Sequence, residues 1–330
     1  MSKRERNLAR ALTLALICSL TGCSPEGSVR HLTIATGGTG GIYFPLGGAL
    51  ARIYTESLPG INASAQATAG SLFNCGAVER GQADIAFSMA DVAYQAYHQG
   101  TDVQPEPYRH LRAMVPFYDN VVQLVTYRDS SIETVSDLRG KRVGVGAPGS
   151  GTEFNARRVL EAYGIGFDDI EADYLSFSEI VQQLKNQTID AGFINSNYPV
   201  SSIMDLDASV GVKLVPIEPE KAEAIRALDP NYFPTLLPGG TYTSIQEDIP
   251  TMGVSNLLIC REGLEEELVY RLTRLLFEKR AELEATHQAA GRLSLERWRE
   301  VTIPLHPGAE RFFREQETDA TGGGSAERRP

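Results

Sequence analysis

The chain has 330 residues, of which 42% are hydrophobic and 22% are charged, and its formal net charge is -11. This composition is ordinary for a globular protein, and the length allows one large domain or two. The negative charge argues against a nucleic-acid partner, because proteins that bind nucleic acids normally carry a basic face that displaces counterions from phosphates.

The first residues have the pattern of an export signal. A basic start is followed by a short apolar stretch over 12–20 and then by Leu-Thr-Gly-Cys at 20–23. The stretch is too short to span a bilayer, and it ends in small residues as signal peptides do. Its end also resembles a bacterial lipobox, which predicts a lipoprotein signal peptide at 1–22, a lipid anchor on Cys23 and a spacer at 23–30. Plain secretion is the alternative.

Two cysteines remain once Cys18 and Cys23 are assigned to the signal region. They are Cys75 and Cys260, far apart in the sequence. An extracytoplasmic location permits a disulfide between them, and two buried free thiols fit the sequence equally well. No CxxC pair occurs, which argues against a structural zinc site or a thioredoxin-like site.

Strand and helix patterns alternate along the body of the chain. Strands are predicted at 32–35, 63–67, 84–87, 121–127, 142–145, near Tyr174, and at 190–194 and 254–260. Helices are predicted at 44–57, from Ser71 onward, at 91–98, 153–163 and 179–186, and after 263 with Leu264, Leu268, Leu272, Leu275 and Leu276 on one face. This alternation predicts parallel sheets covered by helices. The Gly-rich end at 321–330 is typical of a flexible tail.

One pattern occurs twice. An apolar strand is followed by a Gly-rich turn and a helix at 35–44 and again at 143–154. Each copy has a later strand that begins with aspartate, DIAF at 84–87 and DAGF at 190–193. The two halves are therefore expected to be similar α/β domains. Ligands of open α/β sheets bind beyond the carboxyl ends of the strands, so two facing sheets would make a cleft lined from both sides.

The Gly-rich loops raise the question of a nucleotide. They are TGGTGGIYFP at 36–45 and GVGAPG at 144–149, and the second matches GxGxxG. In a dinucleotide loop the helix begins within the motif, whereas here Pro148 delays the helix to about Thr152. Neither loop carries the Gly-Lys-Ser/Thr sequence of a phosphate-binding loop. A nucleotide site is therefore not predicted.

Patterns for catalysis are missing as well. Ser150 does not lie in GxSxG, and the five histidines are scattered without HExxH spacing. We therefore expect no enzyme activity, no metal and no cofactor.

Small or hydroxyl-bearing residues stand at three predicted helix starts, at 39–43, 70–71 and 149–152. The first turn of a helix has free N–H groups and the positive end of the helix dipole. Several such ends that point into one cleft make an anion site without any lysine. Helix capping and turn geometry alone also explain each of these residues. Three loops at equivalent strand ends nevertheless favour a cleft for a small molecule.

Several motifs follow one another in a fixed order. They are IATGGTGGIYFPLG at 34–47, TAGS at 68–71, GQADIAF at 81–87, GKRVGVGAPGSGT at 140–152, DAGF at 190–193, GGTY at 239–242 and LHPGAERF at 305–312. Together they resemble the solute receptors of TRAP transporters of the TAXI type, over roughly 31–316. No single motif is decisive, whereas their order and spacing together are specific.

The resemblance implies a type II periplasmic-binding-protein fold, with two α/β lobes joined by a hinge and an interlobe ligand cleft. Lobe I would comprise 31–124 and 247–320, and lobe II 125–246. The implied function is that of a monomeric, non-catalytic receptor. It would capture a small organic acid, glutamate-like or dicarboxylate, and deliver it to a TRAP membrane permease driven by an ion gradient.

The positions that match the family's motifs give the expected ligand-binding residues. They are Thr39, Gly40, Tyr43, Ser71, Ser88, Ser150, Gly151, Thr152 and Asn195. Tyr43 is expected to offer its ring and its hydroxyl, and Asn195 to orient a ligand amine or carboxylate. The chain departs from the family at 193–199, which is more polar, and at Phe44, where a second tyrosine is frequent. Both departures leave the identity of the ligand open.

Two other functions share this fold or this kind of site. The first is the binding protein of an ABC importer, for instance of the thiamine-precursor type. The second is a ligand-sensing module, which the sequence disfavours because it contains no helix-turn-helix and no signalling partner domain. A neighbouring gene for a fused TRAP permease, or for an ATPase, would separate the two transport functions.

Overall fold

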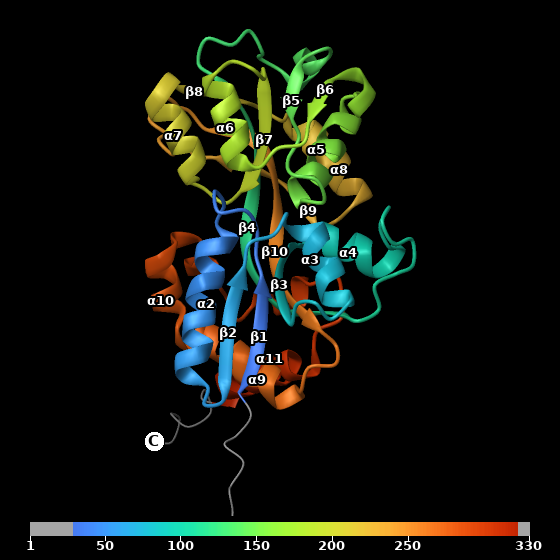
Figure 1. Ribbon diagram of the computed structural model, residues 1–330, viewed down its shortest axis with the longest axis vertical. Helices are drawn as coiled ribbons and strands as arrows, with labels where there is room; N and C mark the ends of the chain where they lie inside the picture. Colours follow the sequence, from blue (N-terminus) through green and yellow to red (C-terminus); the bar gives the residue numbers. More distant parts are fainter. Residues whose placement is uncertain (1–28, 323–330) are drawn as a thin grey trace, which may run out of the picture.

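The computed structural model describes residues 29–322 and has two α/β halves stacked along its long axis (Figure 1). The strands are β1 (Arg30–Ala35), β2 (Ile61–Gln66), β3 (Ile85–Met89), β4 (Leu111–Tyr127), β5 (Arg142–Gly144), β6 (Glu171–Asp173), β7 (Ala191–Ser196), β8 (Val212–Val215), β9 (Tyr232–Leu237) and β10 (Ile249–Arg261). The α-helices are α2 (Tyr43–Ser57), α3 (Ser71–Glu79), α4 (Ala90–Gln99), α5 (Gly151–Ala162), α6 (Phe177–Lys185), α7 (Ser201–Val210), α8 (Pro219–Leu228), α9 (Glu266–Glu278), α10 (Arg280–Thr286) and α11 (Pro307–Gly322).

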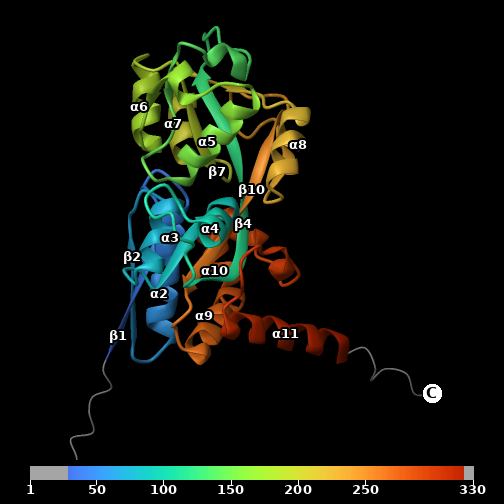
Figure 2. The same cartoon turned by 90° about the vertical axis from the view of Figure 1, so that its right-hand side faces the viewer.

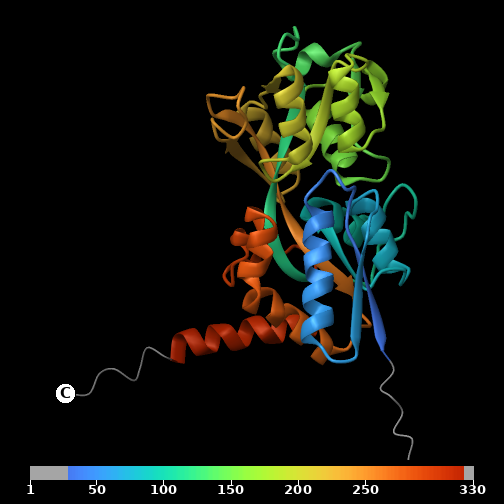
Figure 3. The same ribbon diagram turned by 60° about the vertical axis from the view of Figure 1, so that its left-hand side comes forward.

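The two halves share one sheet. Its strand order is β2-β1-β3-β10-β4-β7-β5-β6, with β8 paired to β4 and β9 paired to β10. The long strands β4 and β10 pair antiparallel and run through both halves (Figure 3). The two-lobed α/β fold is thus confirmed, whereas the expectation of two separate sheets was wrong. The expected lobe ranges, 31–124 with 247–320 and 125–246, remain an approximate division, because β4 and β10 belong to both halves.

Parallel pairing occurs where the sequence pattern repeats. In the first half β1 pairs with β2 and β3, and in the second half β5 pairs with β6 and β7, all parallel. Parallel neighbours need a crossover connection, and here helices supply the crossovers. The carboxyl ends of β1 and β5 therefore both point toward the junction of the halves.

Strand β4 begins at Leu111, ten residues before the predicted start at 121. The missed part contains Pro116, and proline argues against a central strand because it cannot donate a ladder hydrogen bond. The pairing with β10 accommodates it through a register shift between Ser255 and Leu257. A local irregularity therefore explains why the first part of this strand was not predicted.

The long predicted helix corresponds to α9. Leu268, Leu272 and Leu276 are buried on it, in one hydrophobic cluster with Phe312 and Phe313 of α11. The leucine face is thus confirmed, although Leu264 precedes the helix. These contacts fix the carboxyl-terminal helices beneath the first half.

The two body cysteines, Cys75 and Cys260, are both buried and free. The sequence allowed either a disulfide or two free thiols, and the structure shows two free thiols. Burial raises the pKa of the Cys75 thiol to about 12, so this group stays protonated at neutral pH.

The ends of the described chain lie at the same end of the molecule. α11 projects sideways from the first half and runs to Gly322, so the first two residues of the predicted tail at 321–330 are helical (Figure 2). The predicted signal peptide at 1–22, the anchor Cys23 and most of the spacer at 23–30 lie outside the described residues. Within the described range, no helix combines the length and apolar character needed to cross a membrane.

Candidate functional site

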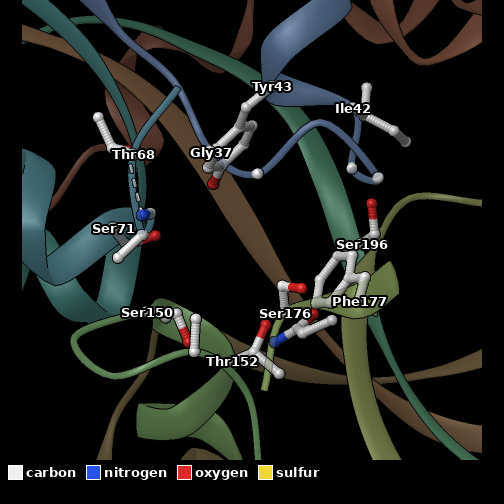
Figure 4. Close-up of a pocket in the computed structure, with 18 of the residues that line it drawn as sticks. Gly37, Ile42, Tyr43, Thr68, Ser71, Ser150, Thr152, Ser176, Phe177 and Ser196 are labelled. Atoms are coloured by element: carbon white, nitrogen blue, oxygen red, sulfur yellow. Dashed lines mark hydrogen bonds between the residues drawn. The ribbon is translucent and has the colours of Figure 1, made fainter. Parts of the chain in front are cut away.

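A cavity of about 250 Å³ lies between the two halves (Figure 4). Both halves supply its walls through loops that follow strand ends and through the first turns of helices. The lining residues are Gly37 to Tyr43, Thr68 to Ser71, Met89 and Asn120 on one side, and Ala147, Ser150 to Thr152, Ser176 to Ser178, Asn195 and Ser196 on the other. None of these lining residues is an acid, an arginine, a lysine or a histidine.

Four helices begin at this cavity. Ile42 and Gly70 are the N-cap residues of α2 and α3, and neither helix has a side-chain cap. Ser150 and Ser176 are the N-caps of α5 and α6, and their hydroxyls accept hydrogen bonds from the first turn. The uncapped ends of α2 and α3 thus present free N–H groups together with the positive ends of their dipoles. This geometry suits an anionic group without a charged side chain.

Eight of the predicted site residues line the cavity, namely Thr39, Gly40, Tyr43, Ser71, Ser150, Gly151, Thr152 and Asn195. Their binding of a solute remains a prediction. Ser88, the ninth, does not line it. The Ser88 side chain is buried, donates to the carbonyl oxygen of Met89 at 3.0 Å, and lies 3.3 Å from the Cys75 Sγ. Side chains alternate along a strand, so Ser88 packs against α3 while the next residue, Met89, reaches the cavity.

The hydroxyl of Tyr43 is used inside the fold. It donates to the side-chain oxygen of Asn256 on β10, and the ring stacks on Phe87 with centroids 4.9 Å apart. Burial raises the pKa of the Tyr43 phenol far above its ordinary value, so the group stays neutral. The expectation that this hydroxyl is available to the ligand is therefore corrected, and the ring is what Tyr43 contributes to the wall.

The two halves touch around the cavity. A Cβ on Gly151 would lie 2.7 Å from the Ser71 Oγ, and one on Gly40 would lie 2.6 Å from the Ser178 Oγ. Both contacts join residues of different halves, and both are closer than real Cβ atoms approach. At both glycines the two halves therefore lie closer together than a side chain at that position would allow.

A buried polar network lies behind the cavity. Asn195 donates to the side-chain oxygen of Asn155 on α5, and Asn155 donates to the Asp91 carboxylate at 2.6 Å. The Tyr232 hydroxyl also donates to Asp91. Burial raises the pKa of Asp91 to about 6, and repulsion from Asp229 adds to this, whereas the hydrogen bonds from Tyr232, Val92 and Asn155 lower it.

Sequence reasoning missed several lining residues. Asn120 lies on the hidden part of β4, and Ser196 ends β7. Ser176 is the N-cap of α6, and the helix begins at Phe177, two positions before the predicted start at Glu179. The signal for this helix start was present, because Ser176 and Glu179 form a capping box.

The solved structures that are similar to this chain include a periplasmic transporter and two binding proteins. The structure of a periplasmic transporter matches with a TM-score of 0.53 at 13% sequence identity, over 92% of this chain and 99% of that chain. The aliphatic sulphonate binding protein SsuA from Escherichia coli matches at 15% identity over 89% of this chain and 87% of that chain, with a TM-score of 0.44. An ancestral arginine-binding protein bound to arginine matches at 18% identity over 82% and 99%, with a TM-score of 0.44.

The fold and the interlobe cavity define a class by architecture, that of two-lobed α/β proteins with a cavity between the lobes. Within this class the assignment is narrower. The profile of the NMT1-like family matches residues 34–316, and the chain belongs to that family.

Proposed function

We propose that this protein is a non-catalytic, extracytoplasmic receptor that captures a small organic acid in the interlobe cavity and delivers it to a membrane importer. The observation that carries the proposal is the meeting of four helix starts, two from each half, around one cavity without charged lining residues. Helix N-termini bind anions through backbone N–H groups, and a cavity of about 250 Å³ suits a metabolite rather than a peptide.

Closure of the halves completes this site. The α2 and α3 ends of the first half are uncapped, and the second half adds the hydroxyl of Thr152 and the amide of Asn195. A solute that contacts both halves stabilises the closed form, because it binds that form more tightly than the open one. A membrane transporter can read this closed state as the loaded state.

The class of importer is the finer part of the proposal. Membership of the NMT1-like family favours the alternative function, that of the binding protein of an ABC importer. The ordered motifs, including 34–47 and 140–152, favour a TAXI-type receptor of a TRAP permease. Each candidate transporter, the ABC importer and the TRAP permease, can be reconstituted in liposomes. The transporter with which this protein co-purifies decides between the two functions.

The first experiment is a thermal-shift screen of the purified mature protein against organic acids, neutral sugars and cations. Organic acids such as glutamate and 2-oxoglutarate are expected to raise Tm, because they bind the folded form alone. Calorimetry with the best acid then compares Thr152→Val with Thr235→Val, which lies outside the cavity. We expect Thr152→Val to weaken binding by about 10-fold, the usual cost of one lost hydrogen bond. A clear response to a sugar or a cation, with none to any acid, would overturn the proposal.

A further inference from the structure

Two side chains of the cavity wall each have a buried oxygen that lacks a donor. Asn120 and Asn195 both line the cavity, with exposed fractions of 2% and 3%. In each case the side-chain oxygen, Oδ1, is buried and accepts no hydrogen bond from any described residue. Buried polar atoms are nearly always paired, so each orphaned oxygen calls for a donor.

The orientation of the Asn195 amide is set from outside the cavity. The Asp91 carboxylate only accepts hydrogen bonds when it is ionised, so Asn155 must turn its NH₂ group toward it. The same NH₂ group also reaches the Tyr232 oxygen at 2.9 Å. The Asn155 carbonyl oxygen therefore points the other way, toward Asn195.

Asn195 must then present its own NH₂ group to Asn155, as the structure shows. This leaves the Asn195 carbonyl oxygen as the free end of the amide. The Asn120 amide is oriented in the same way, with its oxygen unpaired, because its NH₂ group donates to the backbone oxygen of Asn195 at 3.4 Å. Two amides whose orientation could otherwise be reversed are thus held as a pair of acceptors.

We propose that Asp91 acts as a positioning residue that fixes Asn195 as an acceptor through Asn155, so that the cavity selects an organic acid that also carries a hydrogen-bond donor, an ammonium or a hydroxyl group. The inference rests on the proposed function, since it assigns the anionic part of the solute to the helix starts. An acid with a keto oxygen in place of the donor would leave the two acceptors unpaired, and a site with unpaired buried polar groups binds such an analogue more weakly.

The hydrogen bonds link the two halves of the molecule. Asp91 is on α4 in the first half, whereas Asn155 and Tyr232 are on α5 and β9 in the second. The groups that act on Asp91 are Tyr232, Asn155, the backbone of Val92 and the nearby carboxylate of Asp229. The relay therefore exists only when the lobes are together, which is when the solute is enclosed.

Calorimetry with matched acids tests the proposal. L-glutamate and L-malate carry a donor, whereas 2-oxoglutarate, glutarate and succinate do not. The wild-type protein is expected to bind a donor-bearing acid at least about 10-fold more tightly than its matched acid. If all five bind with similar affinity, the inference fails while the proposed function stands. If none binds, the organic-acid function fails, and the inference fails with it.

The variant Asp91→Asn tests the relay itself. An amide at position 91 can donate as well as accept, so the side-chain amides of Asn155 and Asn195 can reverse their orientation. The preference for the donor-bearing acid is then expected to fall to less than about 3-fold. Asp229→Asn removes a neighbouring carboxylate that makes no bond to Asn155, and it should keep the full preference. A preference that is unchanged in a folded Asp91→Asn protein would overturn the relay.

A second test measures how the preference of the wild-type protein depends on pH, so it does not depend on whether a variant folds. Protonation makes Asp91 a donor too, so the preference measured at pH 5 is expected to be smaller than that at pH 7.5. An equal preference at both pH values would contradict the role of Asp91.

Discussion

The backbone N–H of Phe73 in α3 donates a hydrogen bond of 3.0 Å to the carbonyl oxygen of Gly149, which belongs to the other half of the molecule. Phe73 lies in the first turn of α3, where backbone N–H groups have no partner within the helix. The bond therefore uses one free donor of the helix to hold the Gly-rich loop of the second half. It joins the two halves beside the cavity.

A side chain at Gly151 should interfere with closure. The Cβ of Gly151→Ala would lie 2.7 Å from the Ser71 Oγ and 2.8 Å from the Met89 Sδ, both in the opposite half. We expect solute affinity to fall about 10-fold or more, whereas the stability of the solute-free protein changes little because the open form avoids the overlap. Calorimetry and thermal unfolding measure the two effects. Gly48→Ala, with open space around it, is the matched control. An unchanged affinity in Gly151→Ala would show that closure does not bring these atoms together.

Removal of the Tyr43 hydroxyl should cost stability more than affinity. In Tyr43→Phe the side-chain oxygen of Asn256 loses its donor while the ring stays in the wall. A buried acceptor without a partner costs about 1–3 kcal/mol of unfolding free energy. Urea unfolding is expected to show this loss, and calorimetry is expected to show solute binding within about 3-fold of wild type. A large loss of affinity with normal stability would instead place the hydroxyl on the solute.

The ionisation of Asp91 should appear in the pH dependence of stability. Its pKa is raised from 3.8 to about 6 in the folded protein. The folded state therefore holds the proton more tightly than the unfolded state, and stability falls as pH rises from about 4 to about 6. The shift in pKa corresponds to a contribution of about 2–3 kcal/mol to stability. This contribution is fully lost when the pH is above the pKa of Asp91 in the folded protein.

Asp91→Asn lacks this pH-dependent contribution. Relative to wild type, the variant is therefore expected to be more stable at pH 7.5 than at pH 4.5. Urea unfolding of both proteins at both pH values measures this difference. The same relative stability at both pH values would show that Asp91 is ionised as easily in the folded as in the unfolded chain.

Arg297 joins the two long strands where their register shifts. Its guanidinium donates to the Asp119 carboxylate at 2.7 Å and to the Ser255 hydroxyl at 2.8 Å. Arg297→Gln is expected to lower the unfolding free energy by about 1–3 kcal/mol, since hydrogen bonds to charged groups are among the stronger ones. Arg314→Gln breaks an exposed pair with Glu310 on α11 and should change stability by less than about 0.5 kcal/mol. Equal effects of the two substitutions would remove the special role of Arg297.

The proposed lipid anchor can be tested in cells. Labelled palmitate is expected to be incorporated into the wild-type protein and to disappear in Cys23→Ala, because that thiol is the expected attachment point. The variant should also leave the membrane fraction. Label that persists in Cys23→Ala would rule out Cys23 as the site of attachment.

Local sequence was sufficient for the helix starts and for most of the cavity wall. Glycine can adopt the backbone conformations that a tight turn between a strand and a helix requires, so TGGTGGIYFP at 36–45 and the loop before Gly151 predicted where α2 and α5 begin. Parallel strands with helical crossovers then bring those starts to one edge. Eight expected residues consequently line one cavity, although Ser88 was assigned to it wrongly because strand alternation turns it away.

Tertiary structure decided what local patterns could not contain. The first ten residues of β4, which contain Pro116, were not predicted, yet this strand joins the lobes and carries Asn120 to the cavity wall. The partner of the Tyr43 hydroxyl, Asn256, lies more than 200 residues away in the sequence. The link from Asp91 through Asn155 to Asn195 likewise exists only where two lobes meet. Sequence by itself determined the helix ends that suit an anion, because backbone geometry is local. The orientation of the Asn155 and Asn195 amides depended on contacts between distant segments.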